Sequence, residues 1–214
     1  RLLDKGKLDD ATAQSASNTL NNLGTTLLEL ARYDEAETVL VRALHYSPKH
    51  VDANWNLGVV RLTQGKWDGW HGYEYGFKAG ERKARPYYDE IPSWQGEDLN
   101  GKTVLVYGEQ GVGDEILFAQ CLPDLKKFCK KIIFDCHPRL EGLFAQSFPY
   151  AACVGKRKDY SAGLFDDKRI DFHTPIGSLP MWFRQRDEHF LQGDGQYLKA
   201  RSKEVKKWRE KAPG

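Results

Sequence analysis

The stretch 105-LVYGEQGVGDEILFAQCL-122 marks a change of architecture within the chain. A β-branched and aromatic run ends in a glycine-punctuated loop, and a segment with helical apolar periodicity follows it. Strand and helix signals then keep alternating, with strands at 102–108 and 131–137 and helices at 114–128 and 138–146. This alternation predicts a parallel, doubly wound sheet of the Rossmann-like kind.

The elements predicted after this segment complete an α/β domain, which we expect at residues 102–214. Short strands are predicted at 151–155 and 170–174, a short helix at 178–183, and a closing helix at 201–211 with its basic face in solvent. Residues 81–101 contain two prolines and two glycines without sustained periodicity, so they read as a linker across a surface, with Trp94 as its anchor.

Residues 1–80 show an internal repeat. Aligning the chain with itself at an offset of 34 pairs Leu23-Gly24 with Leu57-Gly58, a period that predicts stacked helical hairpins. Gly24 and Ala36 would let two helices approach closely, and Leu23, Leu40 and Leu44 would fill the space beside them. The second unit departs from the pattern at Trp70 and Glu74 and reads as a terminal, capping repeat.

The first unit resembles a tetratricopeptide repeat. The positions that carry the resemblance are Leu20, Leu23, Gly24, Ala36, Leu40, Ala43 and Pro48. Solenoid repeats bind peptides in a concave groove, so Asn18, Asn22 and Asn56 are the candidate peptide-binding residues. The alternative is that these few repeats only pack on the α/β domain, because such repeats need about three copies for stability.

The composition of the chain indicates which classes of binding partner to expect. The 32 Lys and Arg residues nearly balance 30 Asp and Glu, so the net charge of +2 favours neither nucleic acid nor an anionic membrane. No apolar run reaches the ~18 residues of a spanning helix, and we expect a soluble, cytoplasmic protein. The four cysteines, Cys121, Cys129, Cys136 and Cys153, have no metal or redox spacing, and we predict that they are buried small hydrophobes in a reducing compartment. No metal and no cofactor is predicted.

The glycine-rich turn lies where doubly wound sheets bind ligands, after the first strand. Its third dinucleotide-fingerprint position falls on Ile116, and no Gly-Lys-Ser/Thr follows, which argues against a nicotinamide cofactor or a phosphate loop. Gly111 and Gly113 would permit close backbone approach, while Glu109 and Gln110 add polar groups. Asp114 has two interpretations: a helix cap contributing about 1 kcal/mol, or a general base.

The segments 69-GWHGYEYGFKA-79, 91-IPSWQGEDLNGKTVLVYGEQGVGDEILFAQCLPDL-125, 172-FHTPIGSLP-180 and 197-YLKA-200 resemble bacterial proteins that join tetratricopeptide repeats to a glycosyltransferase-like domain similar to the heptosyltransferases. The resemblance implies a GT-B type fold with two facing α/β domains, of which this chain contains the amino-terminal one. It makes Asp114 the candidate base for the acceptor hydroxyl. In such proteins Gly111 and Gly113 would shape the turn, and His173, Thr174 and Ser178 would lie along the same substrate edge as Glu109 and Gln110. The alternative for His173 is a hydrogen-bonded histidine at a strand end.

The same resemblance implies a parent protein that transfers a sugar from a nucleotide-sugar to a glycan or protein acceptor. The donor is held mainly by the second domain of such enzymes, so we expect this chain alone to be inactive. The competing hypothesis is a non-catalytic protein-interaction module built from the repeats and the α/β domain.

Overall fold

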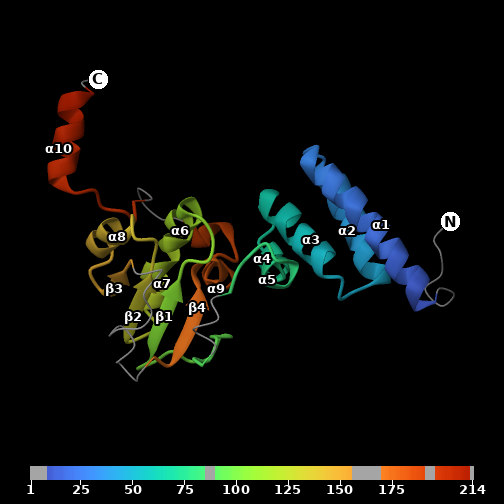
Figure 1. Cartoon of the computed structure of the whole chain (residues 1–214), viewed down its shortest axis with the longest axis horizontal. Helices are drawn as coiled ribbons and strands as arrows, with labels where there is room; N and C mark the ends of the chain where they lie inside the picture. Colours follow the sequence, from blue (N-terminus) through green and yellow to red (C-terminus); the bar gives the residue numbers. More distant parts are fainter. Residues whose placement is uncertain (1–8, 85–89, 156–169, 191–195, 213–214) are drawn as a thin grey trace. The chain divides into compact units, whose positions relative to one another are not determined.

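The chain forms two compact units, Arg1–Lys83 and Ala84–Gly214, as seen in a computed structural model that describes residues 9–84, 90–155, 170–190 and 196–212 (Figure 1). The first unit is helical, and the second combines helices with a parallel sheet. Helices and a parallel α/β domain, the coarse fold predicted from the sequence, are therefore confirmed. No helix in the described ranges has the length and apolar character needed to cross a membrane.

Within residues 9–83, the helical unit contains five helices: α1 (Asp10–Glu29), α2 (Tyr33–Tyr46), α3 (Val51–Thr63), α4 (Gly69–Tyr73) and α5 (Gly76–Ala79). Asp9 starts α1 by accepting a hydrogen bond from the backbone N–H of Thr12 at 2.7 Å. Apolar side chains spaced at helical intervals on α1, α2 and α3 form one core, which includes Leu27, Ala36, Leu40, Ala43, Ala53, Leu57 and Val60.

Close helix packing at Gly24 is as predicted, since a Cβ there would lie 2.6 Å from Cγ of Leu40. The prediction for Leu23 is wrong, because this side chain is 48% exposed while Leu27, one turn later, is buried. The second hairpin also packs closely, between Gly58 of the repeat alignment and Gly72, which lies outside that alignment. A Cβ at Gly58 would lie 2.6 Å from the backbone carbon of Gly72.

The helical unit extends beyond residue 80, into the range predicted as linker. The side chain of Arg82 is fully buried and forms a 2.7 Å ion pair with Glu74. Its guanidinium lies 4.1 Å from the ring centre of Phe77 and 4.6 Å from that of Tyr73. These contacts fasten the end of the unit to α4 and α5, so the linker begins after Lys83.

In the described part of the second unit, the sheet has four parallel strands in the order β3-β2-β1-β4. They are β1 (Thr103–Tyr107), β2 (Lys131–Asp135), β3 (Ala151–Val154) and β4 (Phe172–Pro175). Every residue of β1 is buried, as expected for an inner strand with both faces covered. All four strands were predicted from the sequence, with bounds that differ by one or two residues.

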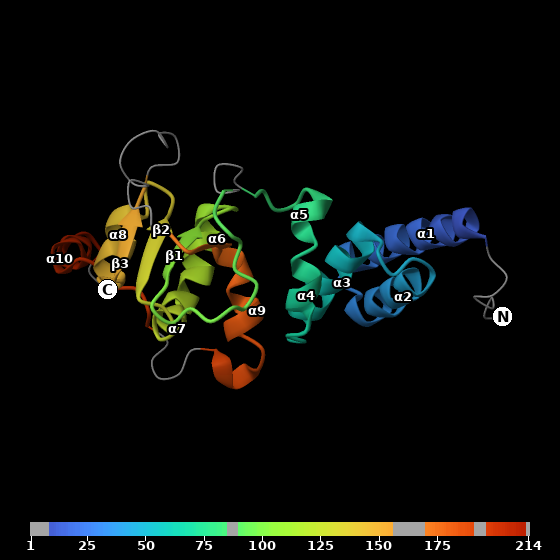
Figure 2. The same cartoon turned by 90° about the horizontal axis from the view of Figure 1, so that it is seen from below.

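The predicted helix 114–128 is interrupted. It forms α6 (Val112–Phe118), a 3-10 turn η3 (Ala119–Cys121) and α7 (Leu122–Lys126). Pro123 lies in the first turn of α7 and has no N–H to continue the preceding helix. The remaining elements are α8 (Glu141–Ser147), η4 (Ile176–Ser178), α9 (Pro180–Phe183), η5 (Asp187–His189) and α10 (Ser202–Lys211). Figure 2 shows α10 at one end of the α/β unit, beside α8.

Trp94 anchors the segment before the sheet, as predicted. It is 8% exposed, its indole Nε1–H donates to the carbonyl of Glu97 at 2.9 Å, and its ring centre lies 5.0 Å from that of Trp182. The neighbouring Ser93 bridges to His173 of β4. Two backbone hydrogen bonds of 2.9 Å hold this contact, from the N–H of Trp94 to the carbonyl of His173 and from the N–H of His173 to that of Pro92.

The cysteines are free thiols in the α/β unit. Cys121, Cys129 and Cys136 are buried, and Cys153 is half-buried. Burial raises the pKa of Cys121 and of Cys136 to about 12 and that of Cys153 to about 11. A thiol with such a pKa forms little thiolate near neutral pH, so these side chains act as small hydrophobes, as predicted.

Candidate functional site

The turn after β1 carries Asp114 at the carboxyl edge of the sheet. Gly111 caps α6 in an extended conformation, with φ of −83°, and its N–H donates to Oδ2 of Asp114 at 2.9 Å. Asp114 therefore fulfils the capping interpretation, with one carboxylate oxygen engaged in the cap. The side chain of Asp114 remains half-buried rather than enclosed.

The glycines of the turn differ from the sequence-based expectation. Gly111 and Gly113 both lie outside the left-handed region, so backbone conformation does not require glycine at either position. A Cβ at Gly111 would meet Oδ2 of Asp114 at 3.1 Å, whereas one at Gly113 would meet no described atom within 4 Å. The backbone at Gly113 is thus accessible.

Glu109 joins this turn to the loop after β4. Its Oε1 accepts a hydrogen bond of 3.2 Å from the backbone N–H of Gly177 in η4. Because β1 and β4 are parallel neighbours, the loops that leave them meet at the same edge. The predicted segments 109–114 and 173–178 are thereby brought together. Gln110 lies in the same turn and is half-buried.

The predicted site residues on β4 and η4 lie deeper than the turn. Thr174 pairs with Val106 in the sheet and is 1% exposed, and Ser178 is 5% exposed. His173 pairs with Leu105, two steps before the end of β4, and its ring centre lies 5.8 Å from that of Tyr107. These side chains therefore lie below the carboxyl edge of the sheet, behind the turn that carries Asp114.

Glu115 is a site residue that the sequence did not reveal. It is 0% exposed, and its Oε2 accepts a hydrogen bond of 2.7 Å from the N–H of His137. A Cβ at Gly108 would lie 2.0 Å from its Oε1, so a larger residue there would displace the buried carboxylate. Glu115 therefore fastens the turn after β1 to the loop after β2. In the sequence, Asp114 and Glu115 resemble two exposed acids at the start of a helix. Gly108 is the sequence feature that accompanies the burial of Glu115, because it leaves room for the carboxylate.

The three asparagines predicted to bind a peptide differ in whether their side chains have partners within the helical unit. Asn56 donates from its amide to Oδ1 of Asn21 at 2.9 Å and to Oγ1 of Thr25 at 3.0 Å, so it ties α3 to α1. Asn18 lies 2.9 Å from Nε2 of His50, which links the same two helices. Asn22 is exposed on α1. Among the three predicted peptide-binding residues, Asn18 and Asn56 thus have structural partners.

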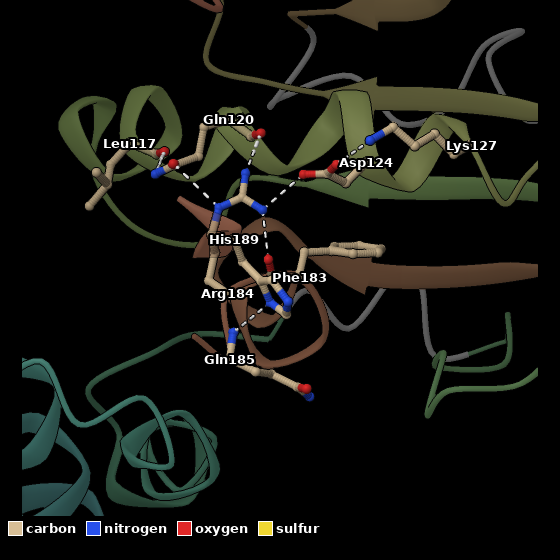
Figure 3. A network of polar contacts seen from close by, with 8 residues as sticks. All are labelled: Leu117, Gln120, Asp124, Lys127, Phe183, Arg184, Gln185 and His189. Atoms are coloured by element: carbon tan, nitrogen blue, oxygen red, sulfur yellow. Dashed lines mark hydrogen bonds and ion pairs between the residues drawn. The ribbon is translucent and has the colours of Figure 1, made fainter. Parts of the chain in front are cut away.

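Arg184 organises a second polar cluster, shown in Figure 3, beside a cavity of about 520 Å³. This 4% exposed side chain donates to Oδ2 of Asp124 at 2.8 Å and to the carbonyls of Gln120 and Phe183 at 2.8 and 2.7 Å. Oδ1 of Asp124 accepts from Lys127 at 2.7 Å. With its donors used in this way, Arg184 links α7 to α9 as a structural residue.

Clusters suited to a metal ion are not present in the described ranges, where no three His, Cys, Asp or Glu side chains converge. The edge of the sheet presents the carboxylates of Glu109 and Asp114 beside the exposed backbone of the turn. The molecule is thus a protein with a helical-hairpin unit and a parallel α/β unit, whose glycine-rich turn presents an aspartate at the carboxyl edge.

The chain matches no protein-family model. It is similar to Protein FlbA of Caulobacter vibrioides, with 29% identity over 134 residues. The match covers 58% of this chain and 22% of that protein. This chain thus spans well under half of the length of the curated relative.

Proposed function

We propose that this chain is a tetratricopeptide-repeat protein whose Rossmann-like α/β unit binds the acceptor in a two-domain, metal-independent glycosyltransferase reaction. The observation that carries the proposal is the position of Asp114. It lies at the carboxyl edge of a parallel sheet, where such folds bind ligands, with its Oδ2 held by the N–H of Gly111 at 2.9 Å. The accessible backbone at Gly113 leaves room for a substrate beside it.

In the proposed reaction, the second carboxylate oxygen of Asp114 takes the proton of an acceptor hydroxyl. The acceptor oxygen then forms a bond to the anomeric carbon of the sugar. The bond between that carbon and the nucleotide breaks, and the nucleotide leaves with the electron pair. The cap holds the carboxylate in one orientation, which favours proton transfer by reducing its conformational freedom. A second domain would supply the nucleotide-sugar site.

The helical unit would serve as a partner-binding or supporting element in a cytoplasmic protein. Support for a repeat comes from the close packing at Gly24 and Gly58, two glycines separated by the repeat period of 34 residues. Exposed Asn22 is the candidate peptide contact among the predicted asparagines.

The alternative function is a non-catalytic interaction module. The hydrogen bond from Gly111 to Asp114 favours it, because a capping residue needs no substrate to explain its presence. Glu109 likewise has a structural partner in Gly177.

The deciding experiment measures sugar transfer by the natural full-length gene product, with a panel of nucleotide-sugars, for the native protein and for Asp114→Asn. Asparagine keeps an oxygen that can accept from Gly111 but cannot serve as a base, so turnover should fall by about 10²–10⁴-fold. Asp98→Asn is the matched control, because Asp98 accepts from the N–H of Asn100 at 3.0 Å in an exposed turn. No turnover with any donor supports the interaction module. Equal turnover in the native protein and Asp114→Asn would instead contradict the role of Asp114 as the base and leave it as a helix cap.

A further inference from the structure

The helix α10 contributes a face that the proposed function does not use. Val205 and Trp208 of this helix, together with its flanking cap residues Arg201 and Ala212, follow the spacing of one helical face and line a cavity beside α8. None of the residues of α10 is buried, and Trp208 is 62% exposed. A ten-residue helix has little stability without tertiary contacts, so additional contacts on this face would stabilise α10.

The start of α10 is fixed on α8. The side-chain amide of Gln146 donates to the carbonyl of Ala200 at 3.0 Å, and the N–H of Lys199 donates to the hydroxyl of Ser147 at 2.9 Å. Arg201 rests on the backbone of α8, since a Cβ at Gly142 would lie 2.6 Å from its Nη2. The amino-terminal end of α10, which forms one side of the cavity, is therefore held on α8.

The cavity between α8 and α10 has a volume of about 730 Å³. Its apolar wall includes Leu143, Val205 and Trp208. A volume of this size lies within the range of about 300–1,000 Å³ that small-molecule sites occupy. Its concave shape suits a small ligand better than a flat membrane surface.

Charge is strongly one-sided in this cavity. Four cations line it, Arg139, Lys199, Arg201 and Arg209, against the single carboxylate of Glu204. Glu204 lies 3.8 Å from Lys207, outside the cavity lining. The three guanidinium groups have no ion-pair partner in the described part of the chain. An anionic ligand would balance this excess charge.

We propose that the cavity between α8 and α10 binds a small phosphomonoester with an aromatic or aliphatic body. A phosphomonoester carries nearly two negative charges at neutral pH, and guanidinium groups form paired hydrogen bonds to phosphate oxygens. The organic body would pack on Trp208 and Leu143. This inference is independent of the proposed glycosyl transfer, because it uses no residue of the turn at Asp114.

The test is isothermal titration calorimetry of the whole chain with 1-naphthyl phosphate at physiological salt. The matched probes are 1-naphthol, which lacks the phosphate, and inorganic phosphate, which lacks the ring. We expect saturable 1:1 binding of 1-naphthyl phosphate and at least about tenfold weaker binding of both partial probes, since each lacks one of the two interactions.

Two variants of α10 separate the cavity from general surface charge. Arg209 lines the cavity, whereas Lys206 does not, although both are exposed cations of the same helix. Arg209→Gln should weaken binding of 1-naphthyl phosphate about tenfold, and Lys206→Gln less than about twofold. Hydrogen exchange should slow in 202–211 when 1-naphthyl phosphate binds, because the ligand stabilises the folded helix.

Several outcomes would overturn the proposal. Equal losses in the two variants would indicate non-specific attraction. Equal affinity for naphthol would show that the arginines do not contribute. Absence of 1-naphthyl phosphate binding would overturn the proposal. Retention of the protein on phosphatidylglycerol vesicles or on an acidic peptide in that case would assign the cations to a larger anionic partner.

Discussion

Gly108 and Glu115 fit together at the start of the candidate site, where a Cβ on the glycine would lie 2.0 Å from Oε1 of the buried glutamate. Because this glutamate also accepts the N–H of His137 at 2.7 Å, the loops after β1 and β2 are held by one side chain. The geometry of the turn that carries Asp114 therefore depends on a residue that faces away from solvent.

Replacing Gly108 by alanine should destabilise the α/β unit by about 1–3 kcal/mol, because the new methyl group overlaps a buried carboxylate. Gly113→Ala is the control. Its Cβ meets no described atom within 4 Å, and alanine is the better helix former, so this change should be neutral or stabilising. Urea unfolding of both variants measures the difference, and equal free energies of unfolding would contradict the packing at Gly108.

Glu115→Ala should cost about 1–3 kcal/mol, because it leaves the buried N–H of His137 without its acceptor. Glu115→Gln keeps an acceptor oxygen of the same shape and should retain most of the stability. Chemical denaturation followed by circular dichroism compares the two. A glutamine variant as unstable as the alanine variant would show that the charge, rather than the hydrogen bond, holds the turn.

The two cations on Asp124 should differ in energetic importance. Arg184 is 4% exposed, whereas the side chain of Lys127 is 69% exposed. Arg184→Met should destabilise the protein by about 2–4 kcal/mol, because it removes a buried network, and Lys127→Met by less than about 0.5 kcal/mol. Thermal unfolding tests this order, and similar shifts in Tm would contradict it.

Acid should weaken the same network. Burial raises the pKa of Asp124, but the hydrogen bonds from Lys127 and Arg184 outweigh it and lower the pKa below the ordinary value of 3.8. A depressed folded-state pKa gives stability that is present above the unfolded value and is lost as pH falls through the folded one. Stability should therefore fall below about pH 4, and less steeply in Asp124→Asn. Parallel acid-unfolding curves would contradict this.

In the helical unit, Gly58→Ala should be costlier than Gly24→Ala. At Gly58 the new Cβ would meet the backbone of Gly72 at 2.6 Å, whereas at Gly24 it would meet the side chain of Leu40 at the same distance. A side chain can shift and backbone cannot, so we expect about 1–3 kcal/mol at Gly58 and a smaller loss at Gly24. Helix signal during urea unfolding provides the measurement. The reverse order would indicate that α3 and α4 separate easily.

Local patterns predicted the strands well, because β-branched runs of buried residues bounded by loops have few alternative structures. The location of the turn at Asp114 also followed from the sequence, since the carboxyl ends of parallel strands meet at one edge. The cap between Gly111 and Asp114 depends on contacts within a few residues, so it could be anticipated. Trp94 was anticipated as an anchor, although its contacts with Trp182 and His173 are distant in sequence.

The features that the sequence did not predict depend on contacts between residues distant in the chain. The burial of Arg82 depends on Glu74 and on aromatic rings of α4 and α5, and a run of mixed charges resembles a linker until those partners are known. Whether Thr174 and Ser178 reach solvent depends on the layers around the sheet, which strand periodicity does not reveal. Glu115 is buried against Gly108 and against the loop after β2, whose His137 is distant in sequence.

The contact between Ser93 and His173 has a consequence for association. β4 is an outer strand of the sheet, and such strands offer unpaired backbone groups to other molecules. Trp94 and Pro92 use the backbone carbonyl and N–H of His173 on that side. The segment before the sheet thus occupies part of the outer edge of β4, which leaves fewer backbone groups of that strand open to pairing with another molecule.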